Sequence, residues 1–183
     1  MYHHSPFNQV LSNPNLKPVE IVLIAGMVSI KTHPGEEVFL SGENMTDENS
    51  MPFLHETDDV IRIDRHSLFN LISQREMVNL VIYIPETCDL MVLLRGGNLN
   101  LKGNFGQVRA RTDAGNIIAD LSDFTVKGQA DLSVFAGEIK LINNNPSNRQ
   151  SKHQRILNMK IGEEGRLKAK VSLGDVRVMT MAE

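Results

Sequence analysis

A five-residue pattern led by glycine recurs through the second half of the chain and constrains its fold more than any other feature. In each copy, glycine is followed by a polar residue, an apolar residue, any residue and a second apolar residue. The copies begin at Gly97, Gly106, Gly115, Gly128, Gly137, Gly165 and Gly174. Successive glycines are 9, 9, 13, 9, 28 and 9 residues apart, and the nine-residue step also separates Gly26 from Gly35.

Each copy has the properties of one short strand. Glycine supplies the turn conformation that other residues adopt only with strain, and the residues two and four positions later lie on one face of a strand. Two copies form one coil of 18 to 22 residues. The pattern therefore predicts an all-β fold, a right-handed parallel β-solenoid with about two short strands per coil. An antiparallel β-sandwich is the alternative, because hairpins also place strands at this spacing.

The predicted coils bring apolar positions of successive copies into columns. One side of the core is expected to contain Leu99, Leu101, Ile117, Ala119, Ile139 and Leu141, and the other side Val108, Ala110, Ala130 and Leu132. In the polar position after glycine, Asn98 is expected to stack on Asn116, and Gln107 on Gln129. Such amide ladders satisfy their own donors and acceptors along parallel strands.

The first half of the chain alternates in the same way over 27–32, 37–41, 60–64 and 79–84, which predicts strands there. A short helix capped by Ser67 is predicted over 66–78, and a loop over 44–56. The predicted domains are a disordered or extended N-terminal arm, 1–18, and a single solenoid domain, 19–183, with a polar basic loop at about 143–155.

A family resemblance rests on these glycine-led segments. The stretch Val81-Ile82-Tyr83-Ile84-Pro85, followed by the repeats from Gly97, resembles the bacterial putative-adhesin domain family, whose function is unknown. The segments from Gly26 and Gly35 resemble that family's opening turns, so the likeness covers roughly 19–181. The resemblance implies a single-domain β-solenoid with no catalytic residues to carry over. Members often carry an export signal or a membrane anchor.

Charge divides the chain into two halves. Residues 1–90 contain 5 basic and 13 acidic residues, whereas residues 91–183 contain 14 basic and 9 acidic residues. The segment 139–162 contains five cations and no acid, and these are predicted to contact an anionic partner, either a glycan or a protein. They are Lys140, Arg149, Lys152, Arg155 and Lys160.

Catalytic and metal-binding signatures are missing from the sequence. The acids of the repeats, Asp113, Asp120, Asp123 and Asp131, fall in turns or on different walls of the predicted register, whereas a glycosidase needs two carboxyl groups that face each other. The only cysteine, Cys88, has no histidine beside it. We therefore predict no catalytic residue, no cofactor and no metal site.

Taken together, these features predict a non-enzymatic binding or scaffold protein that is adhesin-like and has an unidentified ligand. The alternatives are a carbohydrate-active enzyme on a β-helix and a bactofilin-like self-assembling cytoskeletal protein. The expected partner is a second copy, bound through the C-terminal coil, because a solenoid ends in open strand edges. Nucleic acid is not expected as a partner, since Trp is absent and aromatic residues make up 5% of the chain. As written, the chain shows no signal peptide or membrane span, which predicts a cytoplasmic location; the alternative is the cell envelope or export by a signal-independent route.

Overall fold

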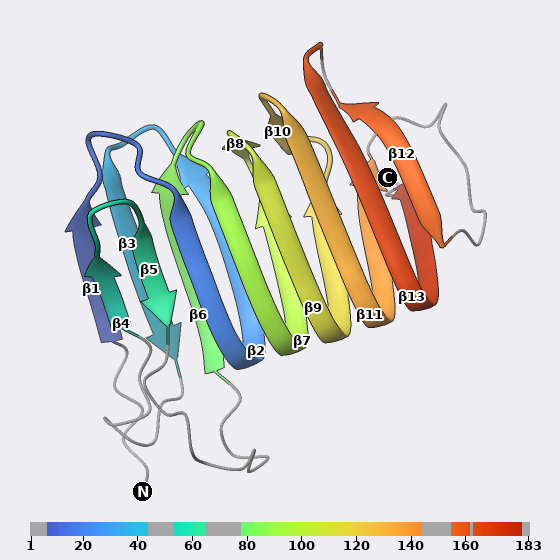
Figure 1. Cartoon of the computed structure of the whole chain (residues 1–183), viewed down its shortest axis with the longest axis horizontal. Helices are drawn as coiled ribbons and strands as arrows, with labels where there is room; N and C mark the ends of the chain where they lie inside the picture. Colours follow the sequence, from blue (N-terminus) through green and yellow to red (C-terminus); the bar gives the residue numbers. More distant parts are fainter. Residues whose placement is uncertain (1–6, 44–52, 65–77, 144–154, 162, 181–183) are drawn as a thin grey trace, which may run out of the picture.

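The structure is a computed structural model that describes residues 7–43, 53–64, 78–143, 155–161 and 163–180. These residues form thirteen strands and no helix, so the predicted all-β class is confirmed for them (Figure 1). In chain order the strands are β1 (Phe7–Ser12), β2 (Val19–His33), β3 (Glu37–Glu43), β4 (Phe53–Glu56), β5 (Ile61–Asp64), β6 (Val78–Pro85), β7 (Leu90–Lys102), β8 (Asn104–Phe105), β9 (Val108–Asp120), β10 (Thr125–Val126), β11 (Gln129–Asn143), β12 (Ile156–Ile161) and β13 (Gly165–Thr180).

Five long strands, β2, β7, β9, β11 and β13, each bend at a glycine. The bending residues have positive φ angles and are Gly26 (154°), Gly97 (110°), Gly115 (131°), Gly137 (141°) and Gly174 (135°). Each glycine is the register partner of the next, so the bends form one column, seen along the lower edge of Figure 1. The column divides each strand into a first arm before the glycine and a second arm after it.

The bends fold one continuous sheet into two facing layers (Figure 1). The first arms form a layer whose order is β4-β5-β2-β7-β9-β11-β13-β12. The second arms form a layer whose order is β1-β3-β6-β2-β7-β9-β11-β13. Strand order therefore follows the long axis of the molecule, from the N-terminal end to the C-terminal end.

The sheet is mixed, which corrects the prediction that the domain is parallel throughout. The five long strands pair in parallel, but β1-β3, β3-β6, β4-β5 and β12-β13 are antiparallel. Gly35 is not part of the glycine column; it lies in the connection between β2 and β3, which are separated in the sheet by β6. Alternation within a strand specifies which side chains are buried but not the direction of the neighbouring strand, and the antiparallel strands lie outside the regular repeats.

Two other predictions concern segments that the structure describes only in part. Residues 66–77 of the predicted helix lie outside the described residues, and Val78 begins β6. The predicted loop over 44–56 is wrong at its end, because Phe53–Glu56 forms β4 and pairs with β5. The rest of that segment, 44–52, lies outside the described residues. Within the predicted N-terminal arm, Phe7–Ser12 forms β1 and pairs with β3.

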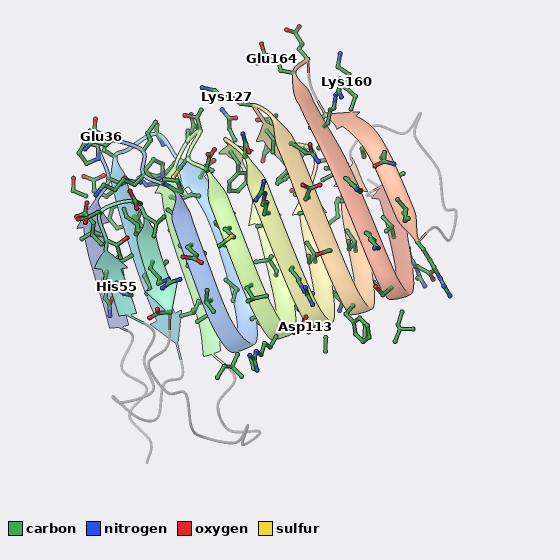
Figure 2. All side chains as sticks on the ribbon, in the orientation of Figure 1. Glu36, His55, Asp113, Lys127, Lys160 and Glu164 are labelled. Atoms are coloured by element: carbon green, nitrogen blue, oxygen red, sulfur yellow. The ribbon has the colours of Figure 1, made fainter. Side chains whose placement is uncertain are left out.

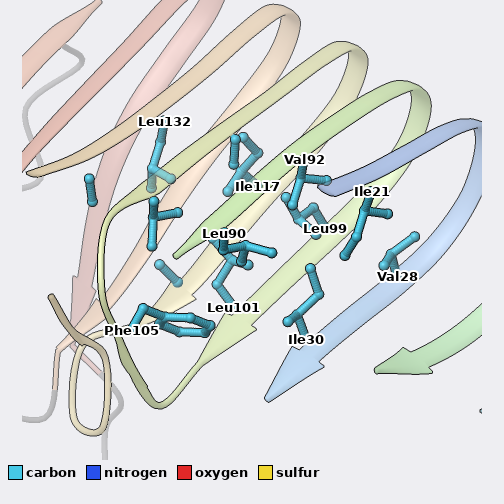
Figure 3. Packing of buried hydrophobic residues seen from close by; sticks show 14 of the residues in the cluster. Ile21, Val28, Ile30, Leu90, Val92, Leu99, Leu101, Phe105, Ile117 and Leu132 are labelled. Carbon is cyan, nitrogen blue, oxygen red and sulfur yellow. The ribbon is translucent and has the colours of Figure 1, made fainter. Parts of the chain in front are cut away.

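The core lies between the two layers and contains the predicted columns (Figure 3). Leu99, Ile117 and Ile139 are register partners in the second arms, and each is fully buried. In the first arms, Val108 pairs with Ala130, and both are also fully buried. The column assignments made from the repeat are therefore confirmed.

The predicted amide ladder is present at the asparagine position. Asn116 Nδ2 donates to Asn98 Oδ1 at 3.0 Å, and the Glu138 backbone N–H donates to Asn116 Oδ1 at 3.0 Å. The glutamine prediction is wrong, because Gln129 Nε2 donates to Asp131 Oδ1 at 2.9 Å instead of to Gln107. A carboxylate two residues away on the same face is a stronger acceptor than a neutral amide.

Candidate functional site

The five cations predicted to contact an anionic partner do not form one cluster. Lys140 lies in the second arm of β11, where its Nζ is 3.5 Å from Glu138 Oε2. Lys160 lies in β12, which belongs to the layer of the first arms, and Arg155 immediately precedes β12. Arg149 and Lys152 lie outside the described residues. The structure therefore separates Lys140 from Lys160 and places them on opposite layers.

A larger group of cations occupies the outer surface of the first-arm layer at its C-terminal end. The strands β9 and β13 alternate there between buried apolar residues and exposed basic ones, as half-buried strands do, and β12 adds the exposed Lys160. We call this surface the cationic face. It consists of Arg109, Arg111, Lys160, Arg166, Lys168 and Lys170.

Register sets the arrangement of the cationic face. Arg109 and Lys168 are both register partners of Asp131 in β11, so they flank it in one row. Arg111 and Lys170 flank Ser133 in the next row in the same way. Two strand spacings separate the cations within a row by roughly 10 Å, and the rows are about 7 Å apart along the strands. The result is a regular two-dimensional arrangement of positive charge.

Few acids neutralise this charge. Arg111 pairs with Asp113, with Nη2 3.1 Å from Oδ1. Asp131 stands between Arg109 and Lys168 and accepts the Gln129 hydrogen bond. Within the described part of the chain, the other five basic side chains of the face have no ion-pair partner.

A groove of about 680 Å³ lies beside β12 and β13 at the end of the cationic face. Its charged lining residues are Lys160, Glu163, Glu164, Arg166 and Lys168. The two glutamates belong to the turn that joins β12 to β13, and Figure 2 shows Glu164 and Lys160 at the C-terminal end of the molecule. An anionic ligand would be repelled by the turn and attracted along the strands, toward Lys168 and Arg109.

The acids of the repeats are engaged by neighbouring polar groups. Lys102 Nζ lies 2.9 Å from Asp123 Oδ2 and 3.4 Å from Asp120 Oδ2, so both carboxylates bind one ammonium group. The hydrogen bonds that its ammonium group donates to Asp123 and Asp120 raise the pKa of Lys102. Burial alone would raise the pKa of Asp120, but hydrogen bonds from Ser122 and Lys102 lower it overall. The Asp120 carboxylate is thus held in the ionised form, which suits a structural contact.

Cys88 is buried in the core and is held by the segment before β2. Its Sγ donates to the Lys17 carbonyl oxygen at 3.1 Å and accepts from Asn13 Nδ2 at 3.8 Å. Burial, with a smaller contribution from the charge of Asp89, raises the pKa of the thiol to about 11. The thiol is therefore protonated at neutral pH and is a poor nucleophile.

The part of the chain that the structure describes contains no group of three or more His, Cys, Asp or Glu side chains arranged to hold a metal ion. Among the same residues, no helix has the length and apolar character needed to cross a membrane.

Sequence reasoning missed most of the cationic face. The missed residues occupy the outward positions of the repeat; they are Arg109, Arg111, Arg166, Lys168 and Lys170. The prediction instead followed the clustering of cations along the sequence, which favoured the polar segment at 143–155. The signal was present as basic residues at every second position, in Arg109-Ala-Arg111 and Arg166-Leu-Lys-Ala-Lys170. Only the parallel register shows that these two segments lie on the same surface.

The comparisons with known proteins show similarity at the level of the fold. No protein-family model and no curated protein sequence matches the chain. Among solved structures, the chain is similar to one described as a putative cell adhesion protein from Clostridium sporogenes. The TM-score is 0.55 at 12% sequence identity, and the alignment covers 97% of this chain and 100% of that chain. This match shows a shared fold.

Two further solved structures are similar at lower TM-scores. A putative lipid binding protein from Parabacteroides distasonis has a TM-score of 0.40 at 16% identity, covering 75% of this chain and 66% of that chain. A putative adhesin from Bacteroides fragilis has a TM-score of 0.32 at 8% identity, covering 96% and 97% of the two chains. Of the three structures, the first has the score that supports a shared fold.

Proposed function

We propose that this chain is a non-enzymatic, adhesin-like binding protein that holds an acidic polysaccharide on its cationic face. The observation that carries the proposal is the row-by-row placement of Arg109, Arg111, Lys168 and Lys170 on β9 and β13, the two parallel strands that flank β11. The structure that shares the fold is described as a putative cell adhesion protein, which agrees with a binding role.

The scaffold suits a long ligand. We interpret the five bent strands as the coils of a solenoid that is covered by further strands at its N-terminal end and, at its C-terminal end, by β12 on the first arm alone. Their side chains stand on a rigid, hydrogen-bonded surface, so binding orders few protein groups and loses little conformational entropy. Charges repeated at fixed spacings along an extended face match a polymer with repeated carboxylates better than a small anion.

Reversing two charges of the face should weaken polysaccharide binding. The double substitution Arg109→Glu and Lys168→Glu replaces two attractive contacts with repulsive ones, and we expect the affinity for polygalacturonate to fall by about tenfold or more. Affinity of the unmodified protein should also fall as NaCl is raised from ~0.05 M to ~0.5 M, because salt screens exposed charges. Both effects can be measured by isothermal titration calorimetry.

The matched control is Arg177→Glu, a charge reversal at an exposed residue in the second arm of β13, on the layer opposite to the cationic face. It should leave binding unchanged. Equal weakening by Arg177→Glu would show that net charge alone attracts the polymer, which contradicts the proposal. Binding of polyglutamate in place of polygalacturonate would assign the face to an acidic protein. Release of shortened polygalacturonate would favour the alternative, a carbohydrate-active enzyme.

We also propose that the chain associates with a second copy through its C-terminal coil. The second arm of β13 pairs with β11 on one side, and no strand among the described residues pairs with its other side. The antiparallel strand β12 covers the first arm alone. An open strand edge favours pairing with another chain, and Leu173, which is 58% exposed, lies next to this edge.

Placing a charge at the open edge should prevent this association. Val178 is partly buried and packs against the core, so Val178→Lys introduces an inward-pointing ammonium group of the kind that blocks edge pairing. We expect sedimentation velocity at high micromolar concentration and low salt to show a dimer for the unmodified chain and a monomer for this variant. Ser172→Lys, an exposed position in the same strand, is the control, and circular dichroism checks folding. A monomeric unmodified chain contradicts this proposal.

A further inference from the structure

A second concave surface lies at the other end of the molecule, on the outer side of the second-arm layer. It is a groove of about 440 Å³ over β1, β3, β6 and the end of β2, and we call it the aromatic groove. The residues that matter for its chemistry are Asn8, His33, Phe39, Ser41 and Tyr83. Because the cationic face lies on the first-arm layer, the aromatic groove is a separate site.

Register brings the aromatic residues together. Phe39 lies between buried Val38 and Leu40, so its side chain points outward, and 37% of its surface is exposed. It is the register partner of Tyr83 in β6 and of Val10 in β1, which places all three in one row. Asn8 and Ser41 are partners in the adjacent row. An exposed phenylalanine beside a tyrosine gives the groove an apolar floor with polar groups next to it.

His33 is fixed in place at one side of the groove. Its Nδ1 accepts a hydrogen bond from the Gly35 N–H at 3.1 Å, and its Nε2 lies 2.6 Å from the Glu37 carbonyl oxygen. Because Nδ1 accepts, the proton is on Nε2, which donates to that carbonyl. The His33 ring packs edge-on against Phe39, with ring centroids 5.3 Å apart, and against Tyr83 at 6.5 Å. These contacts hold the rings in a preformed arrangement.

We propose that the aromatic groove binds a neutral sugar ring of a glycan. The C–H face of a sugar packs on an aromatic ring, and its hydroxyl groups need amide and hydroxyl partners at the ring edge, which Asn8, Ser41 and the Tyr83 hydroxyl provide. The lining itself contains no carboxylate and no ammonium group, and the nearby Lys31 Nζ is taken up by the Tyr83 ring, 5.9 Å from its centroid. This proposal does not rest on the function proposed for the cationic face.

The experiment uses the fluorescence of Tyr83. The chain has no Trp and two Tyr, so in a Tyr2→Phe variant the tyrosine emission comes from Tyr83 alone. This variant is titrated with neutral oligosaccharides built from glucose, N-acetylglucosamine, galactose, mannose or xylose. We expect a saturable change in emission with at least one of them. Removing the ring in Phe39→Ala should weaken that binding by about tenfold.

Two further variants separate binding from folding. Phe135→Ala removes another exposed phenylalanine, 54% exposed in β11 and outside the groove, and should leave binding unchanged. Asn8 is exposed, so Asn8→Ala does not alter the core. This variant should weaken binding even if Phe39→Ala proves unstable. The proposal is overturned if no oligosaccharide gives a saturable change. It is also overturned if decanoate changes the emission and no sugar does, because the groove would then be a site for an acyl chain.

Discussion

Gly97→Ala should abolish the native fold. Gly97 has a φ of 110°, which alanine adopts only with strain, and a side chain here would point at the Gly26 backbone in β2. A Cβ built on Gly97 would overlap the carbonyl oxygen of Gly26 and lie 2.8 Å from its carbonyl carbon. Gly26 cannot move away without breaking the parallel pairing of β2 and β7 on both sides of the bend. Domains of this size are stable by about 5–15 kcal/mol, so we expect no cooperative urea transition for this variant.

The adjacent residue provides a matched control. A Cβ on Gly96 would lie 3.7 Å from the Ile24 carbonyl oxygen, an ordinary contact. Gly96 is the register partner of Ala114 in β9, and Ala114 is the register partner of Ala136 in β11. Alanine therefore already occupies this position in the next two strands. Gly96→Ala should therefore unfold at nearly the same urea concentration as the unmodified chain. If Gly97→Ala is as stable as Gly96→Ala, the glycine column does not determine the fold.

Ile117→Ala should cost about 2–5 kcal/mol in the free energy of unfolding. Ile117 is fully buried between Leu99 and Ile139 in the core column, and the paired strands on both sides prevent the layers from closing around the lost atoms. The change therefore leaves a cavity as well as removing buried apolar surface. The urea midpoint should fall, whereas the slope of the transition should stay the same, because the surface exposed on unfolding hardly changes.

Ile118 is the control for this experiment. It is the next residue in β9, and its side chain points to the outer surface of the second-arm layer, where it is only partly buried. Ile118→Ala removes the same atoms from the same strand and should cost about 1 kcal/mol or less. Equal losses at both positions would show that the predicted core column is not the buried one.

The repeat predicted the centre of the molecule well and its ends poorly. Glycine spacing identified the bent strands, because a bend that recurs in register needs the same residue each time, and the column from Leu99 to Ile139 followed from it. The antiparallel strands β1, β3, β4 and β12 could not be predicted in this way. They do not repeat, and alternation is the same in parallel and antiparallel strands.

The candidate site was predicted less completely than the core. Its basic residues occupy outward positions that are far apart in the sequence, such as Arg109 and Lys168, and become neighbours only through strand register. The aromatic groove depends on the antiparallel pairing of Phe39 with Tyr83, which the sequence did not indicate. Surfaces built from long-range pairing therefore require the structure, whereas a repeated core can be inferred from the sequence.

The turns that join one long strand to the next differ in length within the molecule. Gly97 and Gly115 are 18 residues apart and Gly115 and Gly137 are 22 apart, yet both pairs are in register. The four additional residues are accommodated between β9 and β11, next to β10, which still pairs with β8. During evolution, turns of this kind can lengthen, or a segment that encodes a whole bent strand can be duplicated, without altering the strands at the two ends of the sheet. New binding surfaces can therefore arise through a change in the number of bent strands, while the packing of the core between the two layers stays the same.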